Sequence, residues 1–344
     1  HLGLTQRMLA TQETGTGAMG QISLLLKAVI ATSLTMQALL AAMFLPRFLS
    51  MGIDPVRAVW DAVFMAISVF NNAGFVILPE GLSPHVTDWW MLIPIILGTT
   101  VGAIGFPVIM DVAKNLRTPR RWRLHTKLTL STYLILAFVG ALALALTEWN
   151  NPATLGAIDT PSKILNAMLA GVNSRSSGLS ALDVGAMQSQ THFLQDILMM
   201  IGGGSASTAG GVKVTTFAVL VLAVIAEARG DRDIETFGRR IPTSAVRLAV
   251  AVSLLGLALV AVSVVLLLSM THYSLDIILF ETVSAFATVG LSTGITPILP
   301  VGAKYVLIFL MFAGRTGSMT VAAALAMRER SRVIRMPEER PIIG

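Results

Sequence analysis

The sequence predicts an all-α membrane protein built from tandem copies of one unit, and three observations support this prediction. Hydrophobic residues make up 54% of the chain and charged residues only 13%, against about 25% charged residues in a typical soluble domain. The mean hydropathy is +0.74. Three short stretches, each ending in a glycine followed by a large apolar residue, also recur along the chain. Their glycines, Gly74, Gly178 and Gly290, are 104 and 112 residues apart, which indicates an internal repeat.

The distribution of basic residues predicts how the chain crosses the membrane. Of the 25 Lys and Arg residues, six lie in 111–127, five in 226–247 and five in 327–344. Such clustering in short polar connections is typical of the cytoplasmic side. We therefore expect loops 114–127 and 227–247 and the C-terminus to be cytoplasmic, with membrane lipid and not nucleic acid as their partner. The opposite connections hold few basic residues: Arg47, Arg57, Lys163, Arg175 and Lys304.

The first copy of the unit begins with an apolar stretch at 22–46, which is long enough to cross a bilayer as a helix. Asp54 and Pro55 are typical of a helix start, and the helix expected at 55–70 is too short to span. A second span is expected at about 90–110. It contains three glycines that permit close helix packing: Gly98, Gly102 and Gly105.

The second copy has a span at about 128–147 and a short helix to about 172, which Thr160 is expected to cap. Its second apolar stretch, 193–225, is too long for one span: as a helix it would measure about 50 Å, against a bilayer core of about 30 Å. Its middle, residues 202–213 (GGGSASTAGGVK), holds too much glycine for a straight helix. Irregular backbone at membrane depth is tolerated where it is buried in protein or lines water, so we expect this segment to face an aqueous cavity.

The third copy has a span at about 248–270, a short helix that follows Ser274 and runs to 286, and a final span at about 303–326. Each copy thus reads as span, half-membrane helix, glycine-bearing loop and span. We call the three loops the first, second and third glycine loops, and they comprise residues 70–75 (FNNAGF), 173–179 (NSRSSGL) and 287–291 (ATVGL).

Half-spanning helices that end in glycine-containing loops favour a central pore for a cation. Glycine permits the positive φ angles that aim carbonyl oxygens at an axis, and such carbonyls can replace the hydration shell of an ion. Each short helix would present its partially negative C-terminal end to the pore. None of the three loops carries a carboxylate. A ring of bare carbonyl groups fits K⁺ as the transported ion.

These residues also carry a resemblance: the chain is similar to the Trk/Ktr/HKT superfamily of potassium transporters, and most closely to the Ktr-type membrane subunit. The resemblance covers essentially the whole chain. It rests on the three glycine loops, on residues 202–213, which we call the gate segment, and on residues 314–317 (GRTG). It implies four repeats around one pseudo-fourfold pore. Because three are visible, we expect a first repeat to precede this sequence.

The resemblance implies the following organisation: a cytoplasmic segment at 1–21, a second pore repeat at 22–113, a third at 128–226, a fourth at 248–327, and a cytoplasmic tail at 328–344. It also implies a selectivity filter and a gate. The filter residues, with K⁺ at the three glycines, would be Asn71, Asn72, Ala73, Gly74, Asn173, Ser174, Ser176, Ser177, Gly178, Ala287, Thr288, Val289 and Gly290. The gate residues would be Gly202, Gly203, Gly204, Ser205, Thr208, Gly210, Gly211, Lys213 and Arg315.

Four charged residues in or near these segments have alternative interpretations. An arginine inside a span is costly unless it faces water or a partner, so Arg315 is either part of the gate, bonded by the polar segment, or a structural donor to a neighbouring helix. Lys213 could instead snorkel to the inner boundary. Glu281 is expected to hydrogen-bond to a neighbouring filter backbone. Arg175 could pair with Asp183.

The sequence therefore predicts potassium uptake across the plasma membrane by a multi-pass, channel-like subunit that is not an enzyme. The alternative is a secondary transporter with a substrate site at the broken helix 193–225. K⁺ would be the transported ion, with Na⁺ as a possible coupling or activating ion and no covalent cofactor. The resemblance implies a homodimer docked on a cytosolic nucleotide-binding regulatory subunit that forms an RCK-type ring.

Overall fold

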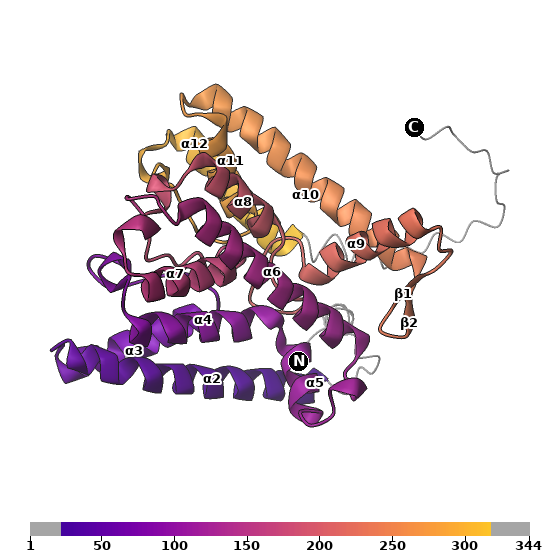
Figure 1. Ribbon diagram of the computed structural model, residues 1–344, viewed down its shortest axis with the longest axis horizontal. Helices are drawn as coiled ribbons and strands as arrows, with labels where there is room; N and C mark the ends of the chain where they lie inside the picture. The colour runs from indigo at the N-terminus through magenta and orange to yellow at the C-terminus, as the bar shows by residue number, and fades with distance from the viewer. Residues whose placement is uncertain (1–21, 318–344) are drawn as a thin grey trace.

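The computed structural model of the protein describes residues 22–317, which form a bundle of helices (Figure 1). The expected segment 1–21, the end of the last span and the tail 328–344 lie outside the described residues. The helices are α2 (Ile22–Ser50), α3 (Pro55–Phe70), α4 (Trp89–Ile104), α5 (Phe106–Lys114), α6 (Leu124–Glu148), α7 (Thr160–Asn173), α8 (Ser189–Met200), α9 (Val214–Arg229), α10 (Thr243–Met270), α11 (Leu275–Phe286) and α12 (Val301–Phe312), and a π-helical turn follows at Ala313–Gly317.

The three expected half-membrane helices are present as α3, α7 and α11. They have 16, 14 and 12 residues and measure about 24, 21 and 18 Å, which is too short to cross a core of about 30 Å. Asp54 caps α3 as predicted, because its side chain accepts from the amides of Val56 and Arg57. The predicted cap of α7 is wrong by one residue: Asp159 and not Thr160 accepts from the amide of Ser162.

Within the described residues, α2, α6 and α10 are each long and apolar enough to cross a membrane. The span predicted at 90–110 is instead broken into α4 and α5, which meet at an angle of 95°. The break lies at Gly105, whose φ of 94° is open to glycine and strained for other residues. The carbonyl oxygen of Ser205 would lie 2.5 Å from a Cβ at this position. The glycine therefore bends the chain around the gate segment.

The long segment 193–225 is broken, as predicted, into α8 and α9. The non-helical residues between them leave α8 at Ile201 and return beside it at Val212, where the two residues form a parallel bridge. The amide of Gly202 donates to the carbonyl of Val212 over 2.8 Å, and that of Val212 donates to Met200 over 3.2 Å. The gate segment is thus a closed loop whose two ends are fastened together.

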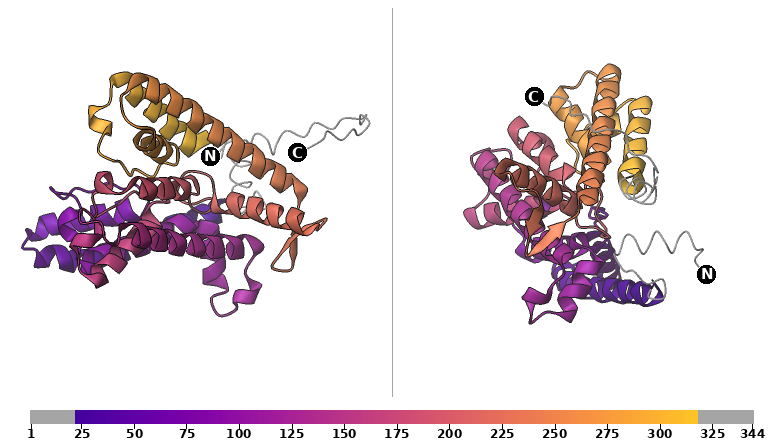
Figure 2. Two further views of the ribbon diagram at one scale, coloured as in Figure 1. Left: turned by 45° about the horizontal axis from the view of Figure 1, so that its top comes forward. Right: turned by 90° about the vertical axis from the view of Figure 1, so that its right-hand side faces the viewer.

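The two largest apolar cores among the described residues hold most of the helices. One is formed by α2, α3 and α4, and Leu165 and Leu169 of α7 extend into it. The other is formed mainly by α10, α11 and α12, with Leu144 of α6 and Met199 of α8. Figure 2 shows α10 to α12, in orange and yellow, lying to one side of the earlier helices. Many large apolar side chains face outward, as expected of surfaces that contact lipid: examples are Leu34, Phe138, Leu146, Leu254 and Val265.

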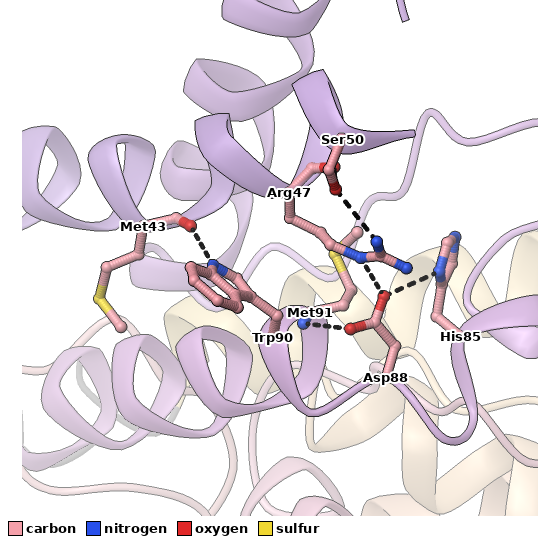
Figure 3. Close-up of polar contacts among 7 residues, drawn as sticks. All are labelled: Met43, Arg47, Ser50, His85, Asp88, Trp90 and Met91. Atoms are coloured by element: carbon pink, nitrogen blue, oxygen red, sulfur yellow. Dashed lines mark hydrogen bonds and ion pairs between the residues drawn. The ribbon is translucent and has the colours of Figure 1, made fainter. Parts of the chain in front are cut away.

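A polar junction joins the end of α2 to the start of α4 (Figure 3). Asp88 lies at its centre: one carboxylate oxygen accepts from Arg47 over 2.6 Å and lies 3.4 Å from Nδ1 of His85. The other oxygen accepts from the amide of Met91, which caps α4. The indole of Trp90 donates to the carbonyl of Met43 over 3.2 Å. A surface cavity of about 510 Å³ opens beside these residues.

The expected loop 227–247 contains a short hairpin that the sequence analysis did not predict. Strands β1 (Ile234–Thr236) and β2 (Arg239–Ile241) pair antiparallel. Phe237 and Gly238 form the turn, and both have positive φ, which is typical of a tight hairpin. The ammonium group of Lys127 lies 5.9 Å from the centre of the Phe237 ring. The two basic loops therefore meet at one end of the molecule.

Gly105 offers a test of the bend. Gly105→Ala is expected to lower the thermal unfolding midpoint of the purified protein, because its Cβ would meet backbone as well as requiring positive φ. Gly230→Ala is the matched control: Gly230 also has positive φ, but no described atom lies within 4 Å of its Cβ position, so it should cost only the ~1–2 kcal/mol of a left-handed backbone conformation. Equal losses in the two variants would contradict the close approach of the gate segment at Gly105.

Candidate functional site

The three glycine loops lie side by side, although they are far apart in the sequence. A Cβ atom on Gly74 would collide with the carbonyl oxygen of Ser177, and one on Gly178 would collide with that of Val289. The second loop therefore lies between the first and the third. Gly290 has no described atom within 4 Å of its Cβ position. All three glycines have positive φ, at 75°, 63° and 95°.

Each glycine loop starts at the C-terminal end of a half-membrane helix. α3 ends at Phe70, α7 at Asn173 and α11 at Phe286. The C-terminal ends of three helices thus point toward adjacent loops, where the partial negative charge of each helix dipole favours a cation. The only formal charge in the three loops is that of Arg175.

A side chain from the last turn of each helix holds its loop in place. In all three copies it donates to the carbonyl of the residue that follows the glycine, so that this carbonyl turns back toward the helix. The pairs are Ser68 with Phe75 (2.7 Å), Asn173 with Leu179 (2.8 Å) and Ser284 with Leu291 (2.6 Å).

The sequence analysis did not assign Ser68 and Ser284 to the site. Their common position, six residues before Gly74 and Gly290, is the signal that could have identified them. In the second loop Asn173 makes the equivalent bond from five residues before Gly178, because its side chain is one atom longer. Sequence spacing alone therefore does not align the three copies at this position.

Asn72 and Thr288 share an unusual backbone conformation. Each lies two residues before its glycine, and each has a φ of 52°. This region is rarely populated by residues other than glycine and is strained for a β-branched residue such as Thr288. Such strain persists where surrounding contacts over-determine the conformation. In both cases the contacts come from the gate segment.

The gate segment packs against the broken end of α4. The amide of Gly204 donates to the carbonyl of Ala103 over 2.7 Å, and that of Thr208 donates to Gly102 over 3.3 Å. These carbonyls belong to the last turn of α4, where a continuous helix would have supplied their partners. The bend at Gly105 therefore frees the acceptors that bind the gate segment.

The same segment contacts two of the glycine loops. Nδ2 of Asn72, in the first loop, donates to Oγ1 of Thr208 over 2.6 Å. In the third loop, Thr288 lies so close to Gly210 that a Cβ there would collide with its hydroxyl oxygen. Because the first and third loops flank the second, the gate segment bridges the two outer members of the set.

Arg315 and Lys213 both bind the gate segment. Arg315 lies in the π-helical turn after α12, and its Nη1 donates to the carbonyl of Thr208 over 2.5 Å. This contact is the one expected if the polar segment bonds the arginine. Nζ of Lys213 donates to the carbonyl of Ala209 over 2.7 Å, so the lysine binds its own segment.

The interpretation of Arg175 as a partner of Asp183 is wrong. The Arg175 side chain is fully buried, and its guanidinium carbon lies 3.6 Å from the centre of the Tyr133 ring. Asp183 instead accepts from the amide of Gly185 over 2.9 Å. Arg175 is thus held against α6 by a cation–π contact, which leaves its charge beside the second glycine loop without a described carboxylate partner.

Glu281 also differs from its expected role. It was expected to bond to a neighbouring filter backbone, but its carboxylate binds the segment that follows its own loop. One oxygen accepts from the amide and hydroxyl of Thr293, over 2.7 and 2.9 Å, and from the hydroxyl of Ser292 over 2.8 Å. The other accepts from Thr296 over 2.6 Å. Glu281 therefore fixes the exit of the third glycine loop.

The remaining residues assigned to the filter and the gate lie in the glycine loops and in the gate segment. Within the described residues, no group of three His, Asp or Glu side chains could hold a metal ion. The hydroxyls of Ser177 and Thr99 lie 3.4 Å apart, and that of Ser205 lies 3.1 Å from that of Thr215. In the glycine loops lie Asn71, Ala73, Ser174, Ser176, Ala287 and Val289, and in the gate segment Gly202, Gly203 and Gly211.

Comparison with known proteins identifies relatives over nearly the whole chain. The family described as TrkH, cation transport protein, matches residues 2–334. The chain is 36% identical to the Ktr system potassium uptake protein B of Bacillus subtilis (strain 168), over 100% of this chain and 76% of that protein. It is 32% identical to the protein of the same name from Vibrio alginolyticus, over 100% of this chain and 75% of that protein.

A further relative and a solved structure are also similar to this chain. The chain is 33% identical to the potassium/sodium uptake protein NtpJ of Enterococcus hirae, over 89% of this chain and 67% of that protein. Its fold is similar to the crystal structure of the potassium transporter TrkH from Vibrio parahaemolyticus, with a TM-score of 0.69 and 18% identity. That match covers 91% of this chain and 66% of the other, and at this identity the likeness concerns the fold.

Proposed function

Because the chain belongs to the TrkH family of cation transport proteins, and so is a membrane transport protein and not an enzyme, we propose that it takes up potassium as the pore-forming subunit of a Ktr-type system. The observation that carries this proposal is the close backbone contact between the three glycine loops. The relatives named as potassium uptake proteins support the choice of ion.

Selectivity would come from backbone carbonyl oxygens of the three glycine loops. A dehydrated cation needs several oxygen ligands at once, and adjacent loops at the ends of three helices can supply them. The serine and asparagine bonds to the carbonyl after each glycine keep that group turned away, which leaves the carbonyls before the glycine to face the axis. The ion sites would lie at Gly74, Gly178 and Gly290, bounded by the other filter residues named above.

A fourth glycine loop would complete the ring. The second loop has a neighbour on each side, whereas no described atom lies near the Cβ position of Gly290. A fourth strand placed beside Gly290 would close the set around one axis, as the four repeats implied by the resemblance require. The pore repeats at 22–113, 128–226 and 248–327 would then be the second, third and fourth.

The gate segment and Arg315 would together control the pore. The gate segment bridges the first and third glycine loops, so it would lie across the axis at one end of the set. Arg315 bonds its centre at Thr208, so a guanidinium group would lie beneath the proposed cation sites. Its charge would oppose the exit of an ion until the segment and the arginine move aside.

The location and partners follow from the distribution of charge. We infer that the protein crosses the plasma membrane several times, with loops 114–127 and 227–247 and the C-terminus in the cytoplasm. The contact between Lys127 and Phe237 joins the two loops into one surface. That surface would dock a cytosolic nucleotide-binding regulatory subunit, an RCK-type ring, beneath a homodimer, and anionic lipid would contact its margins. Na⁺ would act as a coupling or activating ion, as the name of the potassium/sodium relative suggests.

Uptake of ⁸⁶Rb⁺ by potassium-uptake-deficient cells tests the proposed function. Cells that express the full-length protein should accumulate the ion, and Gly290→Ser should reduce uptake by at least about tenfold, because a Cβ at positive φ disturbs the carbonyls. Gly81→Ala, at a positive-φ glycine in the connection between α3 and α4 with no described atom within 4 Å of its Cβ position, is the matched control and should leave uptake near that of the wild type. Uptake by Gly290→Ser equal to the wild type would refute a filter at this position.

The proposed gate can be tested separately, by uptake measurements in the same cells. Arg315→Ala should raise the basal rate of ⁸⁶Rb⁺ uptake, because it removes both the bond to Thr208 and the positive charge. Deletion of part of the segment 202–213 should have the same effect. Lys304→Ala removes a cation whose ammonium group binds the carbonyl of Pro297 in an exposed connection, and it should not raise uptake. If basal uptake is unchanged in both gate variants, neither element restricts the flow of ions.

A further inference from the structure

Thr208 occupies the point at which three parts of the protein meet. Its hydroxyl oxygen accepts from Nδ2 of Asn72 over 2.6 Å and lies within donating distance of two carbonyl oxygens, that of Gly102 at 3.0 Å and that of Phe70 at 3.3 Å. Its amide donates to Gly102, and its own carbonyl accepts from Arg315. Every polar group of this residue is therefore engaged, by partners in the first glycine loop, in α4 and in the π-helical turn.

The bond from Asn72 to Thr208 involves a buried residue in an unfavourable backbone conformation. Asn72 is buried, with positive φ, and its side-chain oxygen has no hydrogen-bond partner among the described residues. Thr208 is the partner found for its side-chain nitrogen. An unfavourable backbone conformation needs external support. Thr208 supplies that support from outside the first glycine loop.

The bond to Phe70 strengthens the same connection. Phe70 is the last residue of α3, and its carbonyl is one of the terminal groups without a partner inside the helix. Gly102 of α4 is packed so closely on this carbonyl that a Cβ there would collide with it. The hydroxyl of Thr208 thus lies in a small polar site made by α3, α4 and the first glycine loop, with little freedom to shift.

We propose that Thr208 is a positioning residue for ion selectivity, because it couples the gate segment to the first glycine loop. The proposal rests on the proposed function and goes beyond it, because this hydroxyl makes the gate and the filter interdependent. The gate segment cannot leave its position without breaking the bond to Asn72 or moving Asn72 with it. A protein that lacks the hydroxyl should therefore both leak and discriminate less between ions.

The test compares the uptake of ⁸⁶Rb⁺ and ²²Na⁺ by cells that express the full-length protein. Thr208→Val keeps the shape of the side chain and removes the hydroxyl, and it should lower the Rb⁺-to-Na⁺ uptake ratio by about fivefold, the factor associated with one hydrogen bond. Thr208→Ser keeps the hydroxyl and should restore the ratio of the wild type. Thr271→Val removes a hydroxyl bonded to the carbonyl of Leu267 at the far end of α10, and it should change nothing.

Arg315→Ala separates this inference from the gate itself. It removes the bond to the backbone carbonyl of Thr208 but leaves the bond between the Thr208 hydroxyl and Asn72, so it should raise uptake while it changes the ratio less than Thr208→Val does. Should Thr208→Val not accumulate in the membrane, Thr208→Ala is measured in its place. Selective uptake by the wild type with an unchanged ratio in the hydroxyl-free variant would overturn the inference. Absence of Rb⁺ uptake by the wild type would instead overturn the proposed function.

Discussion

The close backbone contact between the glycine loops is the constraint on which the rest of the structure depends. A carbonyl group of one loop occupies the space that a side chain would need on the next, at Gly74 and again at Gly178. The loops meet at the C-terminal ends of three helices that are too short to cross the bilayer. The lengths of α3, α7 and α11, the positive φ angles of the glycines and the side-chain bonds from Ser68, Asn173 and Ser284 all serve this contact.

The bend at Gly105 provides hydrogen-bond acceptors for the irregular backbone of the gate segment. The gate segment contains many amide groups that need acceptors away from water. The broken end of α4 supplies carbonyls of Gly102 and Ala103 that a straight helix would have used internally. The amides of the segment that interrupts α8 and α9 thus bond to the carbonyls at the break between α4 and α5. The bridge between Ile201 and Val212 closes the loop. The stability of the segment is therefore inseparable from the bend.

Local patterns predicted the elements but not the contacts that join distant parts of the chain. Apolar stretches, caps and glycine content predicted the half-membrane helices and the break between α8 and α9. The bend at Gly105 was missed because the segment that packs against it, at Ser205, lies 100 residues away in the sequence. Arg175 was paired with a nearby carboxylate, whereas the ring of Tyr133 is its partner. The Phe237–Gly238 turn lacks the Asn–Gly signal of a tight hairpin, and the role of Thr208 depends on the tertiary structure alone.

The central claim is that an ion binds where the glycine loops meet and not in the broken helix 193–225. Anomalous X-ray scattering from crystals of the full-length protein grown in Rb⁺ tests it most directly, because the signal locates the ion without reference to activity. The account predicts peaks on the axis bounded by Gly74, Gly178 and Gly290. Peaks within 202–213 alone, with none between the glycine loops, would contradict it and favour a secondary transporter.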